Sequence, residues 1–444
     1  MKILLKTQLS LLVLLFCGFL SLNSCSKDGG AEEDSYDWMY GTLTWNSAPT
    51  PSNPDAIPVG IQAKGTPSTN SILLIPMKKE DNLAATSVAF LGSDIVAASY
   101  HGTNKDYKGR IDLIQIDKDG LKKIVATMNV NARINFITSD GVDRIFAGLD
   151  TKNGPILTVI PINGYNFTGT TTSTLRLNGK SVNSLYYTKE NGVEYIYTAT
   201  GGDGKEEATK DSVFDFSGSQ KISQTQFLAR SGFQKSRVDG TKLSPICIQG
   251  NTNNRGKWIA GEGNDIVSLH LSTFNKYTSA QIQYYQGPFK NFSTRQIDSK
   301  SAGWLSQVES KNMCALHTES DGRYIYVCAG EQGLLRHKIV KNASGLKDTL
   351  TMAGTIANNA YTLAFGTLDN KRLFIASGAQ GISTCQTETS GVGLTYSWVL
   401  KDNNFDRTAS ANFLITKNGM LYVAYGHAGV LSVAEDNCFI TGIF

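Results

Sequence analysis

Histidine, carboxylate, amide and phenol side chains recur along this chain at one kind of position, where a short apolar run ends and a glycine-rich turn begins. The residues at these positions are Tyr100, His101, Asp150, Asp203, Glu262, Glu331, Gln380, Tyr425 and His427. Imidazole and carboxylate groups bind Zn²⁺ and similar ions, and convergent polar groups orient small ligands. If the fold brings these positions together, they predict a ligand-binding site in which His101 and His427 are candidate metal ligands.

The apolar runs themselves form an internal repeat. Its three C-terminal copies place Gly330, Gly378 and Gly426 at intervals of 48 residues, which is typical of one four-stranded propeller blade. Looser copies reach the same point near Ser99, Leu149, Gly201 and Gly261. We therefore predict an all-β fold, a seven-bladed β-propeller of four-stranded antiparallel blades over residues 71–444.

Turn signals divide each copy into four strands. The predicted strands of the fifth and sixth copies are residues 314–318, 324–328, 333–339 and 349–356, and residues 361–365, 372–376, 381–385 and 394–399. Residues 71–76 are expected to close the ring by pairing with the last copy, and residues 274–310 are interpreted as an insertion. Hairpins between second and third strands share one face of a propeller. The nine side chains above are therefore predicted to surround one rim, with His101 near His427.

The N-terminus has the pattern of a targeting segment. Lys2 and Lys6 precede an apolar stretch that ends in Leu22-Asn23-Ser24-Cys25. This ending resembles the lipobox of bacterial lipoproteins, and the resemblance implies a signal peptide over residues 1–24 and a lipid anchor on Cys25. Residues 25–70 are expected to form a tether, first acidic and then proline-rich, whose aromatic residues 36–45 dock on the domain.

The acidic stretch at residues 26–34 resembles the export tag of surface-exposed lipoproteins in the Bacteroidetes. The repeats are loosely similar to the Leu-Val-Ile-Val-Asp-repeat propellers of such lipoproteins. These resemblances imply an outer-membrane protein that a lipid anchors at the cell surface, with periplasmic display as the alternative. Ser212 and Thr349 lie in tripeptides similar to the O-glycosylation acceptor of exported Bacteroidetes proteins.

The chain has few marks of a particular chemistry. Its 42 basic and 38 acidic residues leave a formal net charge of +4, and no basic cluster is interleaved with aromatic residues. We therefore expect no nucleic-acid partner. The sequence also contains no nucleophile elbow, no zinc-protease helix motif and no phosphate-binding loop. Because propeller enzymes assemble their sites from distant blades, this absence only mildly favours a protein without catalysis.

Three functions remain open at this point. The first is a non-catalytic surface protein that binds a ligand or a protein partner, in nutrient capture or adhesion, with an outer-membrane transporter or an extracellular glycan as candidate partner. The second is a lactonase- or lyase-like enzyme that uses a metal on the hairpin rim. The third is a structural scaffold in a surface assembly. No cofactor other than that metal is expected.

Overall fold

The computed structural model describes most of the chain between residues 36 and 436. The described residues are 36–47, 55–58, 72–103, 107–202, 212–216, 222–251, 254–274, 277–287, 289, 292, 296–302, 312–330, 333–339, 346–347, 360–368, 371–386, 394–398 and 409–436. The chain divides into two compact units, residues 1–38 and 39–444. In the first unit, Tyr36 and Trp38 begin the 3-10 helix η1 (Tyr36–Met39), with their ring centroids 6.4 Å apart.

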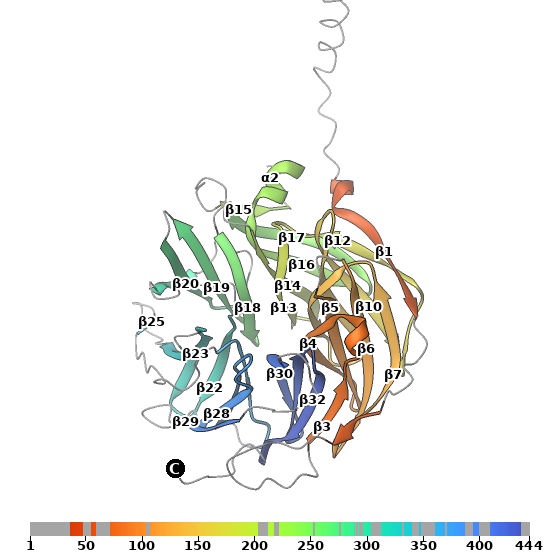
Figure 1. Ribbon diagram of the computed structural model, residues 1–444. Helices are drawn as coiled ribbons and strands as arrows, with labels where there is room; N and C mark the ends of the chain where they lie inside the picture. The colour runs from red at the N-terminus through yellow and green to blue at the C-terminus, as the bar shows by residue number, and fades with distance from the viewer. Residues whose placement is uncertain are drawn as a thin grey trace, which may run out of the picture. The chain divides into compact units, whose positions relative to one another are not determined.

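The second unit is built from repeats of four antiparallel strands that follow one another along the chain (Figure 1). Hydrogen bonding joins three of these repeats into one 15-stranded sheet, a further sheet has five strands, and the other three sheets have four. We number the repeats in chain order. Repeat 1 is β4 (Leu83–Leu91), β5 (Ile95–Gly102), β6 (Gly109–Asp117) and β7 (Gly120–Val130). Repeat 2 is β8 (Arg133–Ser139), β9 (Arg144–Thr151), β10 (Gly154–Asn163) and β12 (Thr171–Arg176). Repeat 3 is β13 (Ser181–Glu190), β14 (Val193–Gly201), β16 (Ser231–Asp239) and β17 (Lys242–Asn251). Short additions are β11 (Asn166–Phe167), β15 (Ser212–Asp215) and α2 (Gln224–Ala229).

The remaining repeats have the same plan. Repeat 4 is β18 (Asn254–Glu262), β19 (Asp265–Phe274), β20 (Tyr277–Tyr285) and β21 (Gln296–Ala302). Repeat 5 is β22 (Cys314–Glu319), β23 (Gly322–Cys328), β24 (Leu334–Ile339) and β25 (Leu346–Lys347). Repeat 6 is β26 (Thr362–Phe365), β27 (Arg372–Ala376), β28 (Ile382–Gln386) and β29 (Leu394–Trp398). Repeat 7 is β30 (Ala409–Lys417), β31 (Met420–Gly426), β32 (Gly429–Ala434) and β3 (Ile72–Pro76).

The first strands of the repeats lie innermost and contact one another in sequence. Contacts join β4 to β8, β8 to β13, β13 to β18, β18 to β22, β26 to β30 and β30 back to β4. Between repeats 5 and 6 the Met313 N–H donates to the Tyr361 carbonyl at 3.1 Å. Such repeated antiparallel sheets around a common axis are the architecture of a β-propeller. The chain is therefore an all-β propeller, as the repeat predicted.

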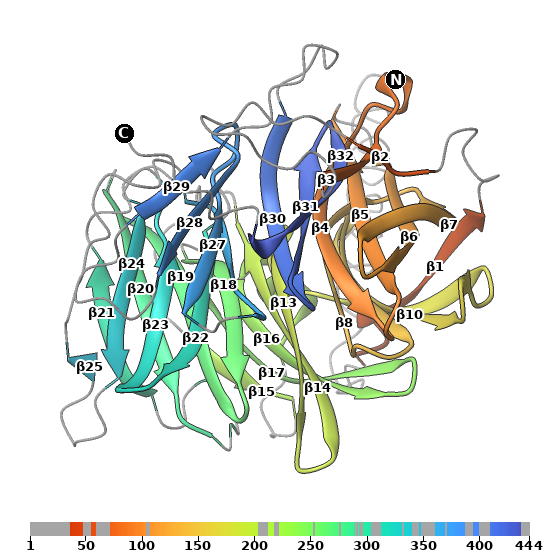
Figure 2. The ribbon, with the colours of Figure 1, turned by 90° about the horizontal axis from the view of Figure 1, so that it is seen from below.

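The predicted strand at residues 71–76 is confirmed as β3, and it pairs with the last repeat. Residues Ile72 to Pro76 are in antiparallel register with β32, and Figure 2 shows β3 beside β32 and β31. Gly426 of β31 in turn bridges to Ala85 at the start of β4. The last repeat therefore takes its fourth strand from the N-terminal side of the chain and contacts the first repeat through β31.

The glycines that reveal the repeat have one shared structural role. Gly330, Gly378 and Gly426 all adopt left-handed backbone conformations, with φ of 58°, 59° and 59°. Each bridges to the innermost strand region of the next repeat, at Ala360, Ala411 and Ala85 respectively. Left-handed conformations are costly for residues with a Cβ atom. The 48-residue interval is thus the interval between equivalent contacts from one repeat to the next.

Polar side chains at β-bulges add a second set of links between innermost strands. The bulged residues donate side-chain hydrogen bonds to carbonyl groups of the following repeat: Thr86 to Ile134 at 3.0 Å, Asn135 to Val182 at 3.2 Å, Asn183 to Gly256 at 2.7 Å and Asn412 to Ala85 at 2.9 Å. A bulge turns one side chain out of the regular alternation of the strand. Here it turns that side chain towards the neighbouring repeat.

Part of the predicted tether is a paired strand. β1 (Tyr40–Ser47) pairs with β12 of repeat 2 through its first residues and with β7 of repeat 1 through its last, while Trp45 is buried. The two-residue strand β2 (Ile57–Pro58) pairs with β3. No helix in the described part of the chain is both long and apolar enough to cross a membrane.

One prediction about repeat 4 is wrong. Residues 274–310 were expected to be an insertion after this repeat, but β20 and β21 within that range are its third and fourth strands. In repeat 5 the short strand β25 pairs with β24, whereas the predicted strand at residues 349–356 lies outside the described residues. The predicted strands of repeat 6 agree with β26 to β29 within one residue at each end.

Candidate functional site

The hairpins between second and third strands carry several of the predicted site residues. His101 lies near the end of β5, Gln380 and His427 lie in the hairpins of repeats 6 and 7, and all three are half-buried. His101 pairs with Ala84, the neighbour of Ala85 to which Gly426 bridges. The hairpins of repeats 1 and 7 are therefore adjacent, as predicted. We call this side of the second unit the second-hairpin face.

Two predicted site residues are packed in the interior instead of facing a rim. Tyr100 and Tyr425 are both fully buried. The Arg110 guanidinium lies over the Tyr100 ring at 5.0 Å from its centroid, and Tyr425 belongs to an apolar cluster with Leu414 and Val423. Both precede their hairpins on the buried side of the strand. This placement corrects the prediction that they contribute to an open ring of polar groups.

Glu262 lies on the opposite side from the one predicted. It ends β18, the innermost strand of its repeat, so it occupies the hairpin between the first and second strands. Its carboxylate accepts a hydrogen bond from Arg323 of repeat 5 at 2.8 Å. We call the side on which the innermost strands end the first-hairpin face. Glu262 therefore joins two repeats there and is not part of the second-hairpin ring.

Asp150 is held between repeats 2 and 3 at the second-hairpin face. Its carboxylate accepts hydrogen bonds from the Val182 N–H at 3.0 Å and from the Asn135 side chain. Burial raises the pKa of Asp150 to about 6, against the smaller opposing effect of these hydrogen bonds. Both oxygen atoms thus have partners in the protein, which gives this carboxylate a structural role between neighbouring repeats.

Other predicted positions are not described or are described only in part. Asp203, Glu331, Thr349 and Cys25 lie outside the described residues, and Ser212 begins β15, of which the backbone is described. Within the described part of the chain, no group of three or more His, Cys, Asp or Glu side chains is placed to hold a metal ion. The predicted metal site at His101 and His427 therefore stays a prediction.

Three aromatic rings meet where the innermost strands surround the axis. Phe136 of β8, Trp258 of β18 and Phe413 of β30 are all buried. The Phe136 ring centroid lies 5.1 Å from that of Trp258 and 5.0 Å from that of Phe413, both edge-on, and the last two are 6.2 Å apart. Edge-on aromatic pairs at such distances are favourable. We call these three residues the axial aromatic cluster.

A cavity of about 460 Å³ adjoins the axial aromatic cluster on the side of the first-hairpin face. Side chains two residues beyond the cluster on each strand line it, namely Thr138, Ala260 and Ile415, because alternate residues of a strand point to the same side. Phe90, Leu185, Tyr186 and Met313 complete much of the wall. The cavity is therefore lined by the innermost strands of five repeats, β4, β8, β13, β18 and β30, and by Met313 directly before β22.

Glycine at one position makes room for the wall of this cavity. A Cβ atom on Gly261 of β18 would lie 2.6 Å from a ring carbon of Tyr186 and 2.6 Å from the Asp265 carbonyl oxygen. The absence of a side chain lets the Tyr186 ring lie against the end of β18. Burial raises the pKa of Tyr186, so it contributes a neutral phenol to the cavity.

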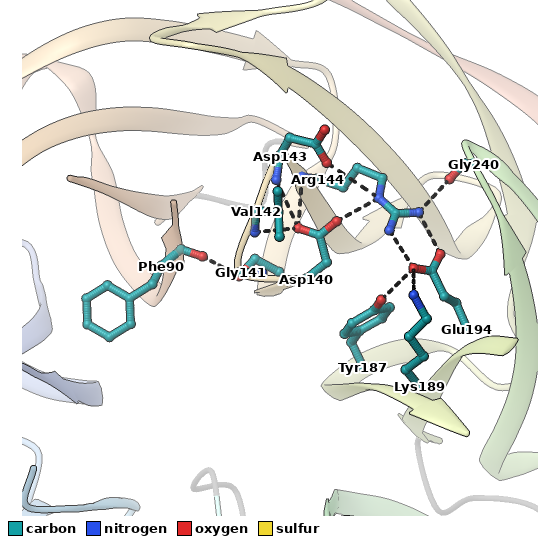
Figure 3. A network of polar contacts seen from close by, with 11 residues as sticks. Phe90, Asp140, Gly141, Val142, Asp143, Arg144, Tyr187, Lys189, Glu194 and Gly240 are labelled. Atoms are coloured by element: carbon teal, nitrogen blue, oxygen red, sulfur yellow. Dashed lines mark hydrogen bonds and ion pairs between the residues drawn. The ribbon is translucent and has the colours of Figure 1, made fainter. Parts of the chain in front are cut away.

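A polar network fixes the mouth of the cavity between repeats 2 and 3 (Figure 3). Asp140, a lining residue, accepts hydrogen bonds from the Val142, Asp143 and Arg144 N–H groups at 2.8, 3.1 and 3.1 Å. Its other oxygen accepts from Arg144 Nε at 2.7 Å. The Arg144 guanidinium also reaches both carboxylate oxygens of Glu194 in repeat 3, at 2.8 and 2.9 Å.

The Arg144 guanidinium strongly shifts the pKa of Glu194. Hydrogen bonds from Arg144 lower the pKa of Glu194 to about 2, and Tyr187 donates a further hydrogen bond to this carboxylate at 2.9 Å. Burial and the Glu194 hydrogen bond together raise the pKa of Tyr187 to about 12. Arg144 also donates to the Gly240 carbonyl at 3.2 Å, so one side chain joins three hairpins.

Sequence reasoning did not find the cavity or the axial aromatic cluster. One signal was present, since Asn135-Phe136-Ile137-Thr138 and Asn412-Phe413-Leu414-Ile415 carry the same amide–aromatic pair in repeats 2 and 7. The amide is the bulged residue that links repeats, and the ring that follows points to the axis. Repeat 4 has Lys257-Trp258 at this point, so the pair is not recognisable there as a copy.

The fold and the cavity together define an all-β propeller with an apolar axial cavity. No protein-family model matches the chain, and no curated protein matches its sequence. Among solved structures it is similar to the Cps50 (Swd1) β-propeller domain of Myceliophteria thermophila, with 9% identity over 78% of this chain and 96% of that one, at a TM-score of 0.48. It is also similar to a chain of the mitotic checkpoint complex, with 10% identity, 92% and 97% coverage and a TM-score of 0.49.

A third similar structure is Sqt1 of Chaetomium thermophilum, which was solved bound to the N-terminus of ribosomal protein L10. Its identity is 11%, the match covers 86% of this chain and all of that one, and the TM-score is 0.48. Likenesses of this order carry no information about what this chain binds. The propeller architecture rests on the strand pairing described above.

Proposed function

We propose that this chain is a seven-bladed propeller that a lipid on Cys25 anchors at the surface of the outer membrane, where it binds a ligand without converting it. The axial cavity is the observation that carries the binding role. Its described lining is mostly apolar, and its one carboxylate, Asp140, is occupied by backbone N–H groups and Arg144. Such a site offers shape and apolar contact rather than an acid or a base.

Seven blades are supported by the agreement between sequence repeat and strand pairing. Each of the seven repeats supplies an innermost strand, and β3 completes the last of them. In this proposal β3, from the N-terminal side, completes the C-terminal blade and holds the ring closed. Opening the ring would require breaking the whole β3–β32 strand pair. In this proposal the ring is a rigid wall around the axial cavity.

The lipid anchor and surface position are tested on intact cells. We expect an alkyne-labelled fatty acid to be incorporated into the wild-type protein and not into a Cys25→Ser variant. We further expect added proteinase K to degrade the wild-type protein without lysis, because the acidic stretch at residues 26–34 resembles an export tag of surface-exposed lipoproteins. Labelling of Cys25→Ser, or full protection of the wild type from the protease, would contradict the proposal.

A metal-dependent enzyme is the second candidate, and one observation favours it. The hairpins that carry His101 and His427 are adjacent in the structure because Gly426 bridges to Ala85. Elemental analysis of the purified protein beside the double variant His101→Ala/His427→Ala separates the two functions. Stoichiometric metal that is lost in the double variant supports the enzyme, whereas an equal, substoichiometric content in both supports the binding protein.

A further inference from the structure

The axial cavity extends from the axial aromatic cluster to the hairpin between β8 and β9. The axial aromatic cluster forms the inner end, where Phe136 contacts both Trp258 and Phe413 edge-on. The mouth is at the first-hairpin face, where Asp140 and Gly141 line it. A volume of about 460 Å³ lies within the range of small-molecule sites in proteins, which is roughly 300 to 1,000 Å³. The cavity therefore suits a compact molecule more than an extended chain.

The lining sets the charge of the occupant. Among the described lining residues only Asp140 is charged, and its side chain is only 4% exposed. One oxygen accepts three backbone N–H groups and the other accepts Arg144 Nε. A cation in the cavity would have to compete with these bonds, and an anion would meet a buried carboxylate. An ion would thus lose its hydration without gaining a partner, which is costly.

The lining also sets the shape of the occupant. Ala260 and Ile415 give aliphatic walls, and the axial aromatic cluster gives aromatic rings at the inner end. Thr138, Ser139 and Tyr186 carry hydroxyl groups in the lining, and the Ser139 hydroxyl donates a hydrogen bond to the Phe90 carbonyl. Aromatic edges pair well with the face of another ring. One or two hydroxyl groups are enough to orient a mostly apolar ligand.

We propose that the axial cavity binds an uncharged, mostly apolar small molecule that carries a ring, with the ring against the axial aromatic cluster and a hydroxyl group beside Thr138. This inference deepens the proposed binding function and rests on it. It places the ligand on the first-hairpin side of the axial aromatic cluster. His101, Gln380 and His427 lie on the opposite, second-hairpin face. The nearby Arg144 network keeps the mouth in place.

Isothermal titration calorimetry with three matched probes tests the inference on the purified full chain. The probes are 4-phenylbutanol, 4-phenylbutyrate and 4-phenylbutylamine, which share one ring and chain and differ in their end group. We expect the alcohol to bind at least tenfold more tightly than either ion. Equal affinity for all three, or no heat from the alcohol at its solubility limit, would overturn the inference.

Variants then locate the binding. Ala260→Phe fills the cavity and is expected to abolish binding of the alcohol. Ile57→Phe enlarges an exposed side chain on β2, outside the lining, and is expected to leave binding unchanged. Thr138→Val removes one hydroxyl and is expected to weaken 4-phenylbutanol several-fold while n-butylbenzene keeps its affinity. Thermal unfolding of each variant shows whether it is folded. Unaltered binding to a folded Ala260→Phe protein would overturn the inference.

The outcome for the cavity is separable from the outcome for the proposed function. If none of the probes binds, the inference about this cavity fails even where fatty-acid labelling and protease sensitivity support a surface lipoprotein. If the alcohol binds as expected while Cys25→Ser is still labelled, the anchored surface role fails and the cavity stands. Each result therefore decides one of the two claims.

Discussion

The rings of Phe136, Trp258 and Phe413 come from strands far apart in the chain, yet they are in direct contact. Phe136 and Phe413 each follow an asparagine whose side chain donates a hydrogen bond to the next repeat, and Trp258 follows Lys257 at the equivalent bulge. The same short segment thus ties a strand to its neighbour and fills the axis. This double use explains why aromatic rings from repeats 2, 4 and 7 meet at the axis.

Phe413→Ala tests this role at the scale of the residue. Removing a buried ring leaves a cavity between repeats 2, 4 and 7, so we expect the free energy of unfolding to fall by about 3 to 4 kcal/mol. Urea denaturation followed by circular dichroism gives the value. Val142→Ala, at a side chain that is 68% exposed, is the control and should change it by less than about 0.5 kcal/mol. A similar small change for Phe413→Ala would show that the ring is not packed.

Glu194 makes the network at the cavity mouth dependent on pH. Its pKa in the folded protein is about 2, below the ordinary value of a glutamate. Its contribution to stability is therefore fully present above about pH 4.5 and is lost as the pH falls towards 2. We expect Glu194→Gln to lower the free energy of unfolding by about 2 kcal/mol at pH 7 and to converge with the wild type in acid.

Denaturation curves at a series of pH values between 7 and 2 measure this convergence. Asp143→Asn is a matched control, because Asp143 lies 3.8 Å from the same guanidinium but is 64% exposed. The free energy of unfolding of Asp143→Asn should match that of the wild type at every pH. If the free energies of unfolding of Glu194→Gln and the wild type differ by the same amount at every pH, the loss of stability in acid does not come from the Arg144–Glu194 pair.

At the scale of the element, the closing strand β3 depends on one glycine. Gly429 and Gly154 each begin the third strand of a repeat, with φ of 111° and 114°. A Cβ atom on Gly429 would lie 2.1 Å from the Ile75 carbonyl oxygen of β3, whereas one on Gly154 would meet no atom within 4 Å. The two positions share a backbone conformation and differ in whether another strand lies against them.

We therefore expect Gly154→Ala to cost about 1 kcal/mol for its backbone conformation, and Gly429→Ala to cost at least about 2 kcal/mol more because β3 must move. Urea denaturation gives both values, and hydrogen exchange of the β3 amide groups shows whether the closing strand has loosened. Equal costs with unchanged exchange in β3 would contradict the view that this pairing closes the ring.

The elements that the sequence predicted well are those with a complete repeat. In repeats 5 to 7 the turn residues, the left-handed glycines and the strand order agree with the structure. Repeat 4 was misjudged because Ile259-Ala260-Gly261-Glu262 looks like Ile375-Ala376-Ser377-Gly378. An apolar run that ends at glycine occurs at either hairpin of a blade, and composition does not distinguish the two. Glu262 was therefore assigned to the wrong face.

The candidate site was less accessible to sequence reasoning than the fold. Polar residues in hairpins are visible along the chain, so they drew attention to the second-hairpin face. The cavity is formed by apolar residues that look like any core, and only the contacts between innermost strands bring Phe90, Ala260 and Ile415 around one space. Tyr100 and Tyr425 show the opposite case, because burial in the fold removes them from the rim that the sequence suggested.

At the scale of the whole molecule, the second unit combines consecutive antiparallel repeats with the axial cavity that their described innermost strands line. The first-hairpin face holds ion pairs between repeats, among them Arg144 with Glu194, Arg323 with Glu262 and Arg372 with Asp436. The second-hairpin face holds the glycine bridges and the bonds of Asp150. Contacts between neighbouring repeats thus hold both faces in place. We therefore expect the walls of the axial cavity to keep their positions when a ligand binds.

Photolabelling tests most directly whether the axial cavity is the place where this protein binds. The probe is 4-phenylbutanol that carries a diazirine on its chain, and peptide mass spectrometry locates the label. We predict label on the ends of β4, β8, β18 and β30 near the first-hairpin face, and its loss when excess 4-phenylbutanol is present. Label concentrated instead around His101, Gln380 and His427 at the second-hairpin face would contradict the account.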